Sequence, residues 1–409
     1  GTVDWETPVV TTEETSDGSA TTTEEADGEA VTGTAAETTT EVSTETTAEA
    51  PAEEVAEDNE TDWGTPAAPS DTEGLSDDES EEGVTGKEDQ AGLAASLTAD
   101  ADGNYTLNSS DDFVALSNLD ASVYQNAQII IAPHDNTPIN LSNTDFKGFG
   151  SDKYPFSGSI GISGTYIGDI TLDRSLFNVL SQMAKVSVLS LKAANNTTSP
   201  VLADKIVKGT AESTQNITVK LDVVAEAGSV EEQYDYSSFG GIIGKLDEGV
   251  SVSLTVNDNI KKEKGVVSGD GNRGFFCNTL GDNASLTVSA FTGEADYSVI
   301  STGGNAGGFV GELGTNAKLT VGTELAYTGS VKGSSNAGGL AGNAKDGAAI
   351  NINAACSVNC SSISSTADIG RSGGISGYAE NPVLVIDDGK ELSVNAGLSA
   401  DNETGAVGG

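Results

Sequence analysis

Basic residues are scarce in this sequence: its 409 residues include 19 Lys and Arg against 63 Asp and Glu, a net charge of −44. Proteins that bind DNA or RNA carry clustered positive charge opposite the phosphate backbone, so we expect no nucleic-acid partner. Long apolar runs are missing too, and a membrane-spanning helix needs about 20 consecutive apolar residues. We therefore expect no insertion into a membrane.

Cysteine and histidine are also rare. The sequence has three cysteines, Cys277, Cys356 and Cys360, an odd number that is too small for a disulfide scaffold. An extended strand would place Cys356 and Cys360 about 13 Å apart, beyond the span of a disulfide. Buried, unreactive thiols are the favoured interpretation; a disulfide across a tight turn and a metal site are the alternatives. His134 is the single histidine, and we expect it to be structural or solvent-exposed rather than part of a catalytic set.

Residues 1–92 differ in composition from the rest of the chain. The first 90 residues hold 28 Asp and Glu but one Lys, and 20 of them are Thr. Such a segment repels itself and cannot bury enough apolar surface to offset its chain entropy. We predict that residues 1–92 form a disordered acidic spacer and that residues 93–409 form the folded part.

Both tryptophans lie in this spacer, within two similar pentapeptides. These are "DWETP" (Asp4–Pro8) and "DWGTP" (Asp62–Pro66). One interpretation is a linear docking motif that the chain presents twice. The favoured interpretation is a duplicated low-complexity unit without a partner.

The folded part begins with a predicted capping helix over Ser109–Leu119. Ser110 can cap it, Asp111 and Asp112 lie at its positive end, and apolar residues recur at helical spacing. Strand-like runs follow at "AQIIIA", "VSVLSLKA", "ITVKLDVVA" and "VSVSLTV". The segment "LFNVLSQM" is interpreted as a short turn, and no second long helix is expected.

Glycine-rich segments recur every 31 to 35 residues from position 241 onward. Each is followed by a strand-like run and a Gly- or Ser-rich return, which predicts three short strands and three corners per repeat. The segments align on Gly241, Gly274, Gly308, Gly339, Gly374 and Gly405. We predict an all-β fold, a right-handed parallel β-helix (β-solenoid) of about nine turns that stops within a repeat at its C-terminal end.

Alternating side chains of the repeat form predicted columns, because every second residue of a strand shares a face. The large apolar column comprises Ile242, Phe275, Phe309, Leu340, Ile375 and Ala406. The small column comprises Gly244, Cys277, Gly311, Gly342, Gly377 and Gly408. The glycine pairs are expected at corners, where positive φ or close backbone approach favours Gly.

A polar column precedes the glycines, at Asn305, Asn336, Arg371 and Asn402. Stacked Asn side chains can form amide ladders, so a structural role is favoured. A ligand-binding row is the alternative.

The segments GGLAG, GGFVG, GGISG and GGIIG resemble the GLUG repeats of bacterial surface proteins, while RGFFC departs from that signature. The upstream segments SSDDFVALSN and FKGFGSDKYPFSGSI are similar to the usual entry into such arrays. The resemblance covers about residues 100–409. It implies an exported, wall- or surface-associated protein of adhesin type, and some relatives attach such repeats to protease domains.

The repeat does not predict a set of catalytic residues. Its aligned exposed positions are Lys245, Asn278, Glu312, Asn343 and Tyr378, which is not the acidic cluster that polysaccharide-acting enzymes need. "DADGNY" and "SGDGNRG" are interpreted as Asp-Gly turns rather than calcium loops, because the spacing and the terminal Glu do not fit. We assign no catalytic, cofactor-binding or metal-binding residue.

These observations predict a non-catalytic bacterial surface or secreted protein, a stalk or adhesin module that contacts a glycan or a host surface protein. The alternatives are a polysaccharide-acting β-helix enzyme and an accessory region of a larger surface protease.

Overall fold

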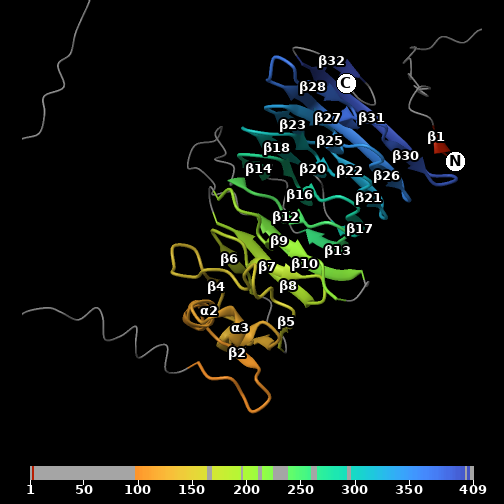
Figure 1. The fold of residues 1–409 in the computed structure, drawn as a ribbon. Coiled ribbons are helices and arrows are strands. Elements are labelled where there is room, and N and C mark those ends of the chain that lie inside the picture. Colours follow the sequence, from red (N-terminus) through yellow and green to blue (C-terminus); the bar gives the residue numbers. More distant parts are fainter. Residues whose placement is uncertain are drawn as a thin grey trace, which may run out of the picture. The chain divides into compact units, whose positions relative to one another are not determined.

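The computed structural model describes residues 2–3, 97–163, 168–194, 197–210, 214–223, 238–258, 265–292, 296–400 and 403–405. Their strands stack into a right-handed parallel β-solenoid of about seven turns, as Figure 1 shows. The predicted fold class is confirmed, but about nine turns is too many, because the coils before residue 177 place no strand in the second sheet. Apart from residues 2–3, the acidic spacer and both tryptophan motifs lie outside the described residues.

The long sheet is the largest of four, with 13 strands, and its strands pair in parallel except at β1, which is antiparallel to β30. Its strands are β1 (Thr2–Val3), β2 (Tyr105–Leu107), β3 (Gln128–Ile131), β4 (Ile139–Asn140), β5 (Ser159–Ile162), β6 (Ile170–Leu172), β8 (Lys185–Ala193), β10 (Gln215–Val223), β13 (Ser251–Asp258), β17 (Ser285–Thr292), β21 (Lys318–Val321), β26 (Ala349–Ile352) and β30 (Val383–Ile386). The four predicted strand-like runs are confirmed as β3, β8, β10 and β13.

The second and third sheets have seven strands each and form the other main faces of the solenoid. The second sheet comprises β7 (Phe177–Ser181), β9 (Ala203–Val207), β12 (Ile243–Leu246), β16 (Cys277–Leu280), β20 (Val310–Leu313), β25 (Ala341–Ala344) and β29 (Ser376–Ala379). The third comprises β11 (Ser238–Phe239), β14 (Gly265–Gly269), β18 (Tyr297–Ser301), β22 (Leu325–Tyr327), β23 (Ser330–Gly333), β27 (Cys356–Ser365) and β31 (Leu392–Ser399). The interpretation of "LFNVLSQM" as a turn is wrong, because most of that segment is strand β7.

A fourth, five-stranded sheet occupies what the sequence predicts to be a corner, so the turns contain four strands rather than three. We call it the corner sheet, and it directly precedes the second sheet along the chain. Its strands are β15 (Arg273–Gly274), β19 (Ala306–Gly307), β24 (Asn336–Gly338), β28 (Arg371–Gly373) and β32 (Glu403–Gly405).

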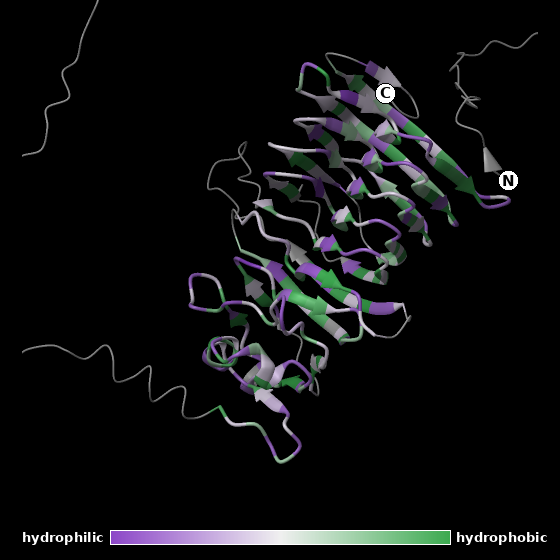
Figure 2. Ribbon diagram, viewed as in Figure 1, coloured by the Kyte–Doolittle hydropathy of each residue, from purple (hydrophilic) through white to green (hydrophobic). Residues whose placement is uncertain are grey.

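The core follows the alternation of side chains along the strands, which Figure 2 shows as alternating hydrophobic and hydrophilic residues. In the long sheet, Val252, Leu286, Leu319, Ile350 and Leu384 pair one above the next, and all five are buried. Each coil thus adds its apolar residues to one continuous interior, the main source of stability in such a stack.

Helices cap one end of the solenoid (Figure 1). Helix α2 (Ser110–Ser117) begins after Ser109, which forms a capping box with Asp112. The predicted helix is confirmed, but Ser109 rather than Ser110 is the cap. A second, four-residue helix, α3 (Ala121–Tyr124), follows, and a 3-10 helix, η1 (His134–Asn136), comes later.

The stacking register corrects two of the six predicted glycine alignments. Gly274 pairs with Gly307, and Gly373 pairs with Gly405. Both Gly274 and Gly405 therefore belong with the first glycine of each GGxxG segment, not with the second. The prediction failed because these two segments contain one glycine where the others contain a pair.

The predicted place of Cys277 in the small column is therefore wrong. Cys277 pairs with Val310, so Phe276 rather than Phe275 enters the large apolar column. Asn278 takes the small-column position instead. Its Oδ1 accepts a backbone N–H at 3.1 Å and its Nδ2 donates to a carbonyl at 2.9 Å, both from glycines of the corner. These two bonds let an amide occupy a site where other coils have glycine.

The large apolar column is otherwise confirmed. The Phe309 N–H donates to the Leu340 carbonyl at 3.0 Å, and the Leu340 N–H donates to the Ile375 carbonyl at 2.9 Å. All three side chains are buried. The final members of the two predicted columns, Ala406 and Gly408, lie outside the described residues.

The glycines of the repeat are needed mainly because backbones approach closely at the corner. A Cβ on Gly338 would lie 1.9 Å from the Ala341 carbonyl oxygen, and one on Gly342 would lie 2.7 Å from the Ala306 nitrogen. Positive φ, the other predicted reason, applies to Gly241 (φ +91°) among the GGxxG glycines. The small column consists mainly of glycine because the backbone of the corner sheet occupies the space that side chains would need.

Candidate functional site

Two columns of polar side chains run along the edge where the corner sheet meets the second sheet. We call this surface the corner strip. The corner sheet and the turn before it contribute Asn272, Asn305, Asn336, Arg371 and Glu403, and the second sheet contributes Lys245, Thr279, Glu312, Asn343 and Tyr378. Each column rises one residue per coil because the strands are parallel and in register.

The first column forms the amide ladder that the sequence predicts. The Asn305 Nδ2 donates to the Asn272 Oδ1 at 3.1 Å, and the Asn336 Nδ2 donates to the Asn305 Oδ1 at 2.8 Å. The backbone N–H of Arg371 continues the ladder by donating to the Asn336 Oδ1 at 3.2 Å. The predicted Asn402 lies outside the described residues, and Glu403 pairs with Arg371 instead.

Asn272 is a ladder member that the predicted polar column does not include. It lies in "SGDGNRG", for which the sequence predicts only a turn. Its distance of 33 positions from Asn305, one repeat length, was the signal that could have identified it. The predicted exposed position Asn278 is likewise corrected to Thr279, which pairs with Lys245 and Glu312.

Glu312 connects the two columns. Its Oε2 accepts from the Asn305 Nδ2 at 3.2 Å and from the Asn343 Nδ2 at 3.4 Å, and its Oε1 contacts the Lys345 ammonium at 2.8 Å. With 16% of its side chain exposed, this carboxylate is partly buried and fully engaged. These three contacts suit a structural anchor that joins the two columns.

The C-terminal end of the corner strip is chemically different. The Arg371 guanidinium lies 4.6 Å from the centroid of the Tyr378 ring, and its Nε contacts Glu403 at 2.5 Å. Tyr378 is half-buried, and 30% of the Arg371 side chain is exposed. This end presents an aromatic ring, a guanidinium and a carboxylate together, which is a combination that can stack on and hydrogen-bond to a polar ligand.

The three cysteines are free and buried. Burial raises the pKa of Cys277, Cys356 and Cys360 to about 12 each, so all three are protonated at neutral pH. Cys356 and Cys360 lie on the same extended strand, β27, where the predicted separation prevents a bridge. The structure therefore agrees with buried, unreactive thiols.

The other predicted chemistry residues are dispersed. His134 is exposed at the start of η1. Asp100 closes a turn by accepting the backbone N–H groups of Asp102 at 2.9 Å and Asn104 at 2.8 Å, as the Asp-Gly turn predicts. Within the described ranges, no three His, Cys, Asp or Glu side chains gather as a metal site would require.

Comparisons with protein-family models, curated proteins and solved structures give no match to the chain. Among the described residues, no helix has the length and apolar character that crossing a membrane requires.

Proposed function

We propose that the chain is a non-catalytic module of a bacterial surface or secreted protein, a stalk or adhesin of the GLUG-repeat type. The observation that carries this proposal is the corner strip. Its polar side chains repeat in vertical register and are joined by hydrogen bonds from coil to coil, as expected of a rod that holds its shape outside the cell. The acidic composition is consistent with a solvated, exported surface.

The contact surface that we propose is the C-terminal end of the corner strip. Sugar rings stack their C–H faces on aromatic side chains, and their hydroxyls pair with guanidinium and carboxylate groups. Tyr378, Arg371 and Glu403 offer these three elements side by side. The ligand class that fits best is therefore a glycan of a host or neighbouring cell.

A glycan array and a whole-cell adhesion assay with the 409-residue chain test this proposal. Tyr378→Ala removes the ring and Arg371→Ala removes the charge, and each variant is expected to bind about tenfold more weakly. Lys332→Ala, on the exposed face of β23, removes a charge elsewhere and should leave binding unchanged. If neither assay detects binding by the unaltered chain, the adhesin role is wrong and the module is a passive spacer.

A further inference from the structure

A concave site lies beside the capping helices, at the end of the described solenoid opposite to Arg371 and Tyr378. It has a volume of about 370 Å³, within the range of about 300 to 1,000 Å³ that small-molecule pockets occupy. We call it the cap pocket. Its polar and aromatic lining includes Asp120, Tyr124, Lys147, Ser151, Lys153 and Tyr154.

The charge of the cap pocket is opposite to that of the chain. Lys147 and Lys153 are its basic lining residues and Asp120 is its one acid, whereas the chain carries a net charge of −44. Neither lysine forms an ion pair with a carboxylate in the part of the chain that the structure describes. Exposed charges more than about 8 Å apart are screened at physiological ionic strength, so the two lysines and Asp120 of the lining count for more than the net charge of the chain.

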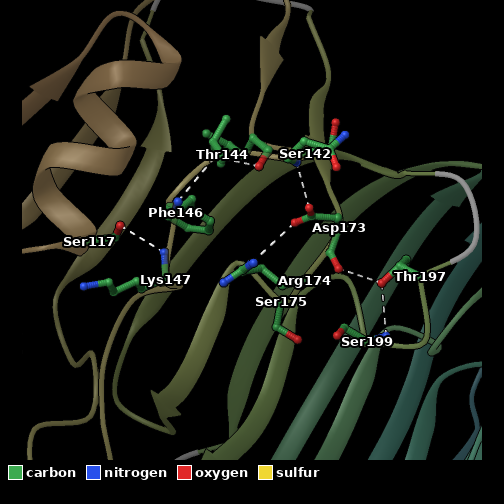
Figure 3. A network of polar contacts seen from close by, with 12 residues as sticks. Ser117, Ser142, Thr144, Phe146, Lys147, Asp173, Arg174, Ser175, Thr197 and Ser199 are labelled. Atoms are coloured by element: carbon green, nitrogen blue, oxygen red, sulfur yellow. Dashed lines mark hydrogen bonds and ion pairs between the residues drawn. The ribbon is translucent and has the colours of Figure 1, made fainter. Parts of the chain in front are cut away.

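Backbone hydrogen bonds fix Lys147 in place. Its N–H donates to the Ser117 hydroxyl of α2 at 3.1 Å, and its carbonyl accepts from the Asn178 Nδ2 of β7 at 2.6 Å. Figure 3 shows the Lys147 side chain extending away from the neighbouring Asp173 and Arg174. The backbone that carries this ammonium is thus held on both sides.

The opposite wall is a tight turn closed by reciprocal backbone hydrogen bonds between Ser151 and Tyr154, at 3.0 and 3.1 Å. The Lys153 ammonium lies 4.8 Å from the centroid of the Tyr154 ring. Behind the turn, the hydroxyl of the buried Tyr124 accepts the Gly150 N–H at 3.3 Å, which leaves its proton to donate. Burial raises the pKa of Tyr124, so this proton is retained at neutral pH.

The acid in the lining favours a ligand that carries hydroxyls as well as a negative charge. The Oδ1 of Asp120 accepts the Ser122 N–H and hydroxyl, and these bonds lower the pKa of Asp120 and keep it ionised. An ionised carboxylate repels a bare anion but accepts hydrogen bonds from sugar hydroxyls. Inorganic phosphate offers no sugar ring with hydroxyls to this carboxylate and would fill only a small part of the cavity.

We propose that the cap pocket binds an acidic saccharide, with the sugar carboxylate at Lys147 and Lys153 and the ring hydroxyls at Asp120, Ser151 and Tyr124. This inference does not depend on the corner strip, which lies on other coils. Failure of either site therefore leaves the other open to its own test.

Saturation-transfer NMR and calorimetry with the 409-residue chain test the site with three matched probes. Glucuronate supplies ring, hydroxyls and carboxylate; glucose lacks the carboxylate; cyclohexanecarboxylate lacks the hydroxyls. We expect glucuronate to bind at least about tenfold more tightly than either of the others, because each lost charged or polar contact costs about that factor. Equal affinity for glucose would overturn the charge assignment, and equal affinity for cyclohexanecarboxylate would overturn the assignment to a sugar.

Variants locate the site. Lys147→Gln and Lys153→Gln keep an unbranched polar side chain, remove one charge each and are expected to weaken glucuronate binding about tenfold. Lys318→Gln, an exposed lysine on the distant strand β21, makes the same charge change and should have no effect. Unchanged binding by the Lys147→Gln, Lys153→Gln double variant, with a native unfolding transition, would overturn the proposal.

Discussion

The cap region (residues 97–194) and the repeat region (residues 238–405) build on the same long sheet and both contain buried aromatic rings, but the repeat region adds a corner built mainly of small residues. The cap region gathers Phe113, Tyr124, Phe146, Phe149 and Phe177 into one aromatic cluster. The later coils of the repeat region have mainly small residues at the corner, where the corner sheet and second sheet touch through their backbones. Large side chains support an irregular end, and glycine allows a tight, periodic wall.

Coil length follows the same division. In the cap region, successive coils of the long sheet are 31 and 26 residues long, from Ile129 to Ile160 and on to Val186. In the repeat region they are 33 and 31 residues, from Leu286 to Leu319 and on to Ile350. The cap pocket lies among the unequal coils, whereas the corner strip runs along the nearly equal ones.

The largest effect is expected from removing the ring at the centre of the cap. Phe149 is fully buried, and its ring lies 5.3 Å from Phe146, 5.8 Å from Tyr124 and 5.9 Å from Phe113, centroid to centroid. We expect Phe149→Ala to cost about 3–5 kcal/mol, because the cavity cannot collapse among rigid rings. Hydrogen-exchange mass spectrometry should show protection lost in the cap region and retained in the repeat region. Equal loss in both regions would show that they unfold as one unit and would weaken the comparison.

A smaller but equally local effect is expected at the corner. Gly338→Ala places a Cβ 1.9 Å from a backbone oxygen, and no flexible side chain can move to relieve the clash. We expect a loss of about 2–3 kcal/mol in urea unfolding, with exchange increased in the repeat region alone. Gly271→Ala is the matched control: its φ is +76° but nothing lies within 4 Å of the added Cβ, so the cost should be about 1 kcal/mol. A control that is as damaging as Gly338→Ala would refute close approach as the reason for the glycine.

The periodic part of this molecule was predictable because each coil repeats the same physical constraints. Glycine spacing and side-chain alternation were enough to predict the stacked coils and the Asn305–Asn336 ladder. They were not enough to set the register at Phe276, because Asn278 takes the position that is glycine in other coils. Its side chain is accommodated there by hydrogen bonds to the backbone of the corner. A sequence pattern that looks for glycine cannot detect that substitution.

The cap pocket was not predictable in the same way. Lys147 and Lys153 meet there because Gly148 and Gly150, each with φ of +78°, redirect the chain between them. The contribution of Asp120 depends on the path that follows α2. None of these contacts has a counterpart one coil later, so no period in the sequence reports them.

The smallest effect concerns pH and reports on the repeat region, because all three cysteines lie there. Burial raises the pKa of Cys277 from its ordinary value of 9.0 to about 12. The unfolded chain ionises this thiol above pH 9 while the folded chain keeps it neutral, so its contribution to stability is present below pH 9 and declines as pH rises toward 12. At pH 10 the decline is about 1 kcal/mol for one thiol. The free energy of unfolding, measured with urea, should therefore fall less between pH 8 and pH 10 for Cys277→Ala than for the unaltered chain, by about that amount. The packing cost of the substitution is the same at both pH values and therefore cancels. If both chains lose the same stability between pH 8 and pH 10, the thiol has the same pKa in the folded and unfolded chains. That outcome would mean that the corner coils open to solvent.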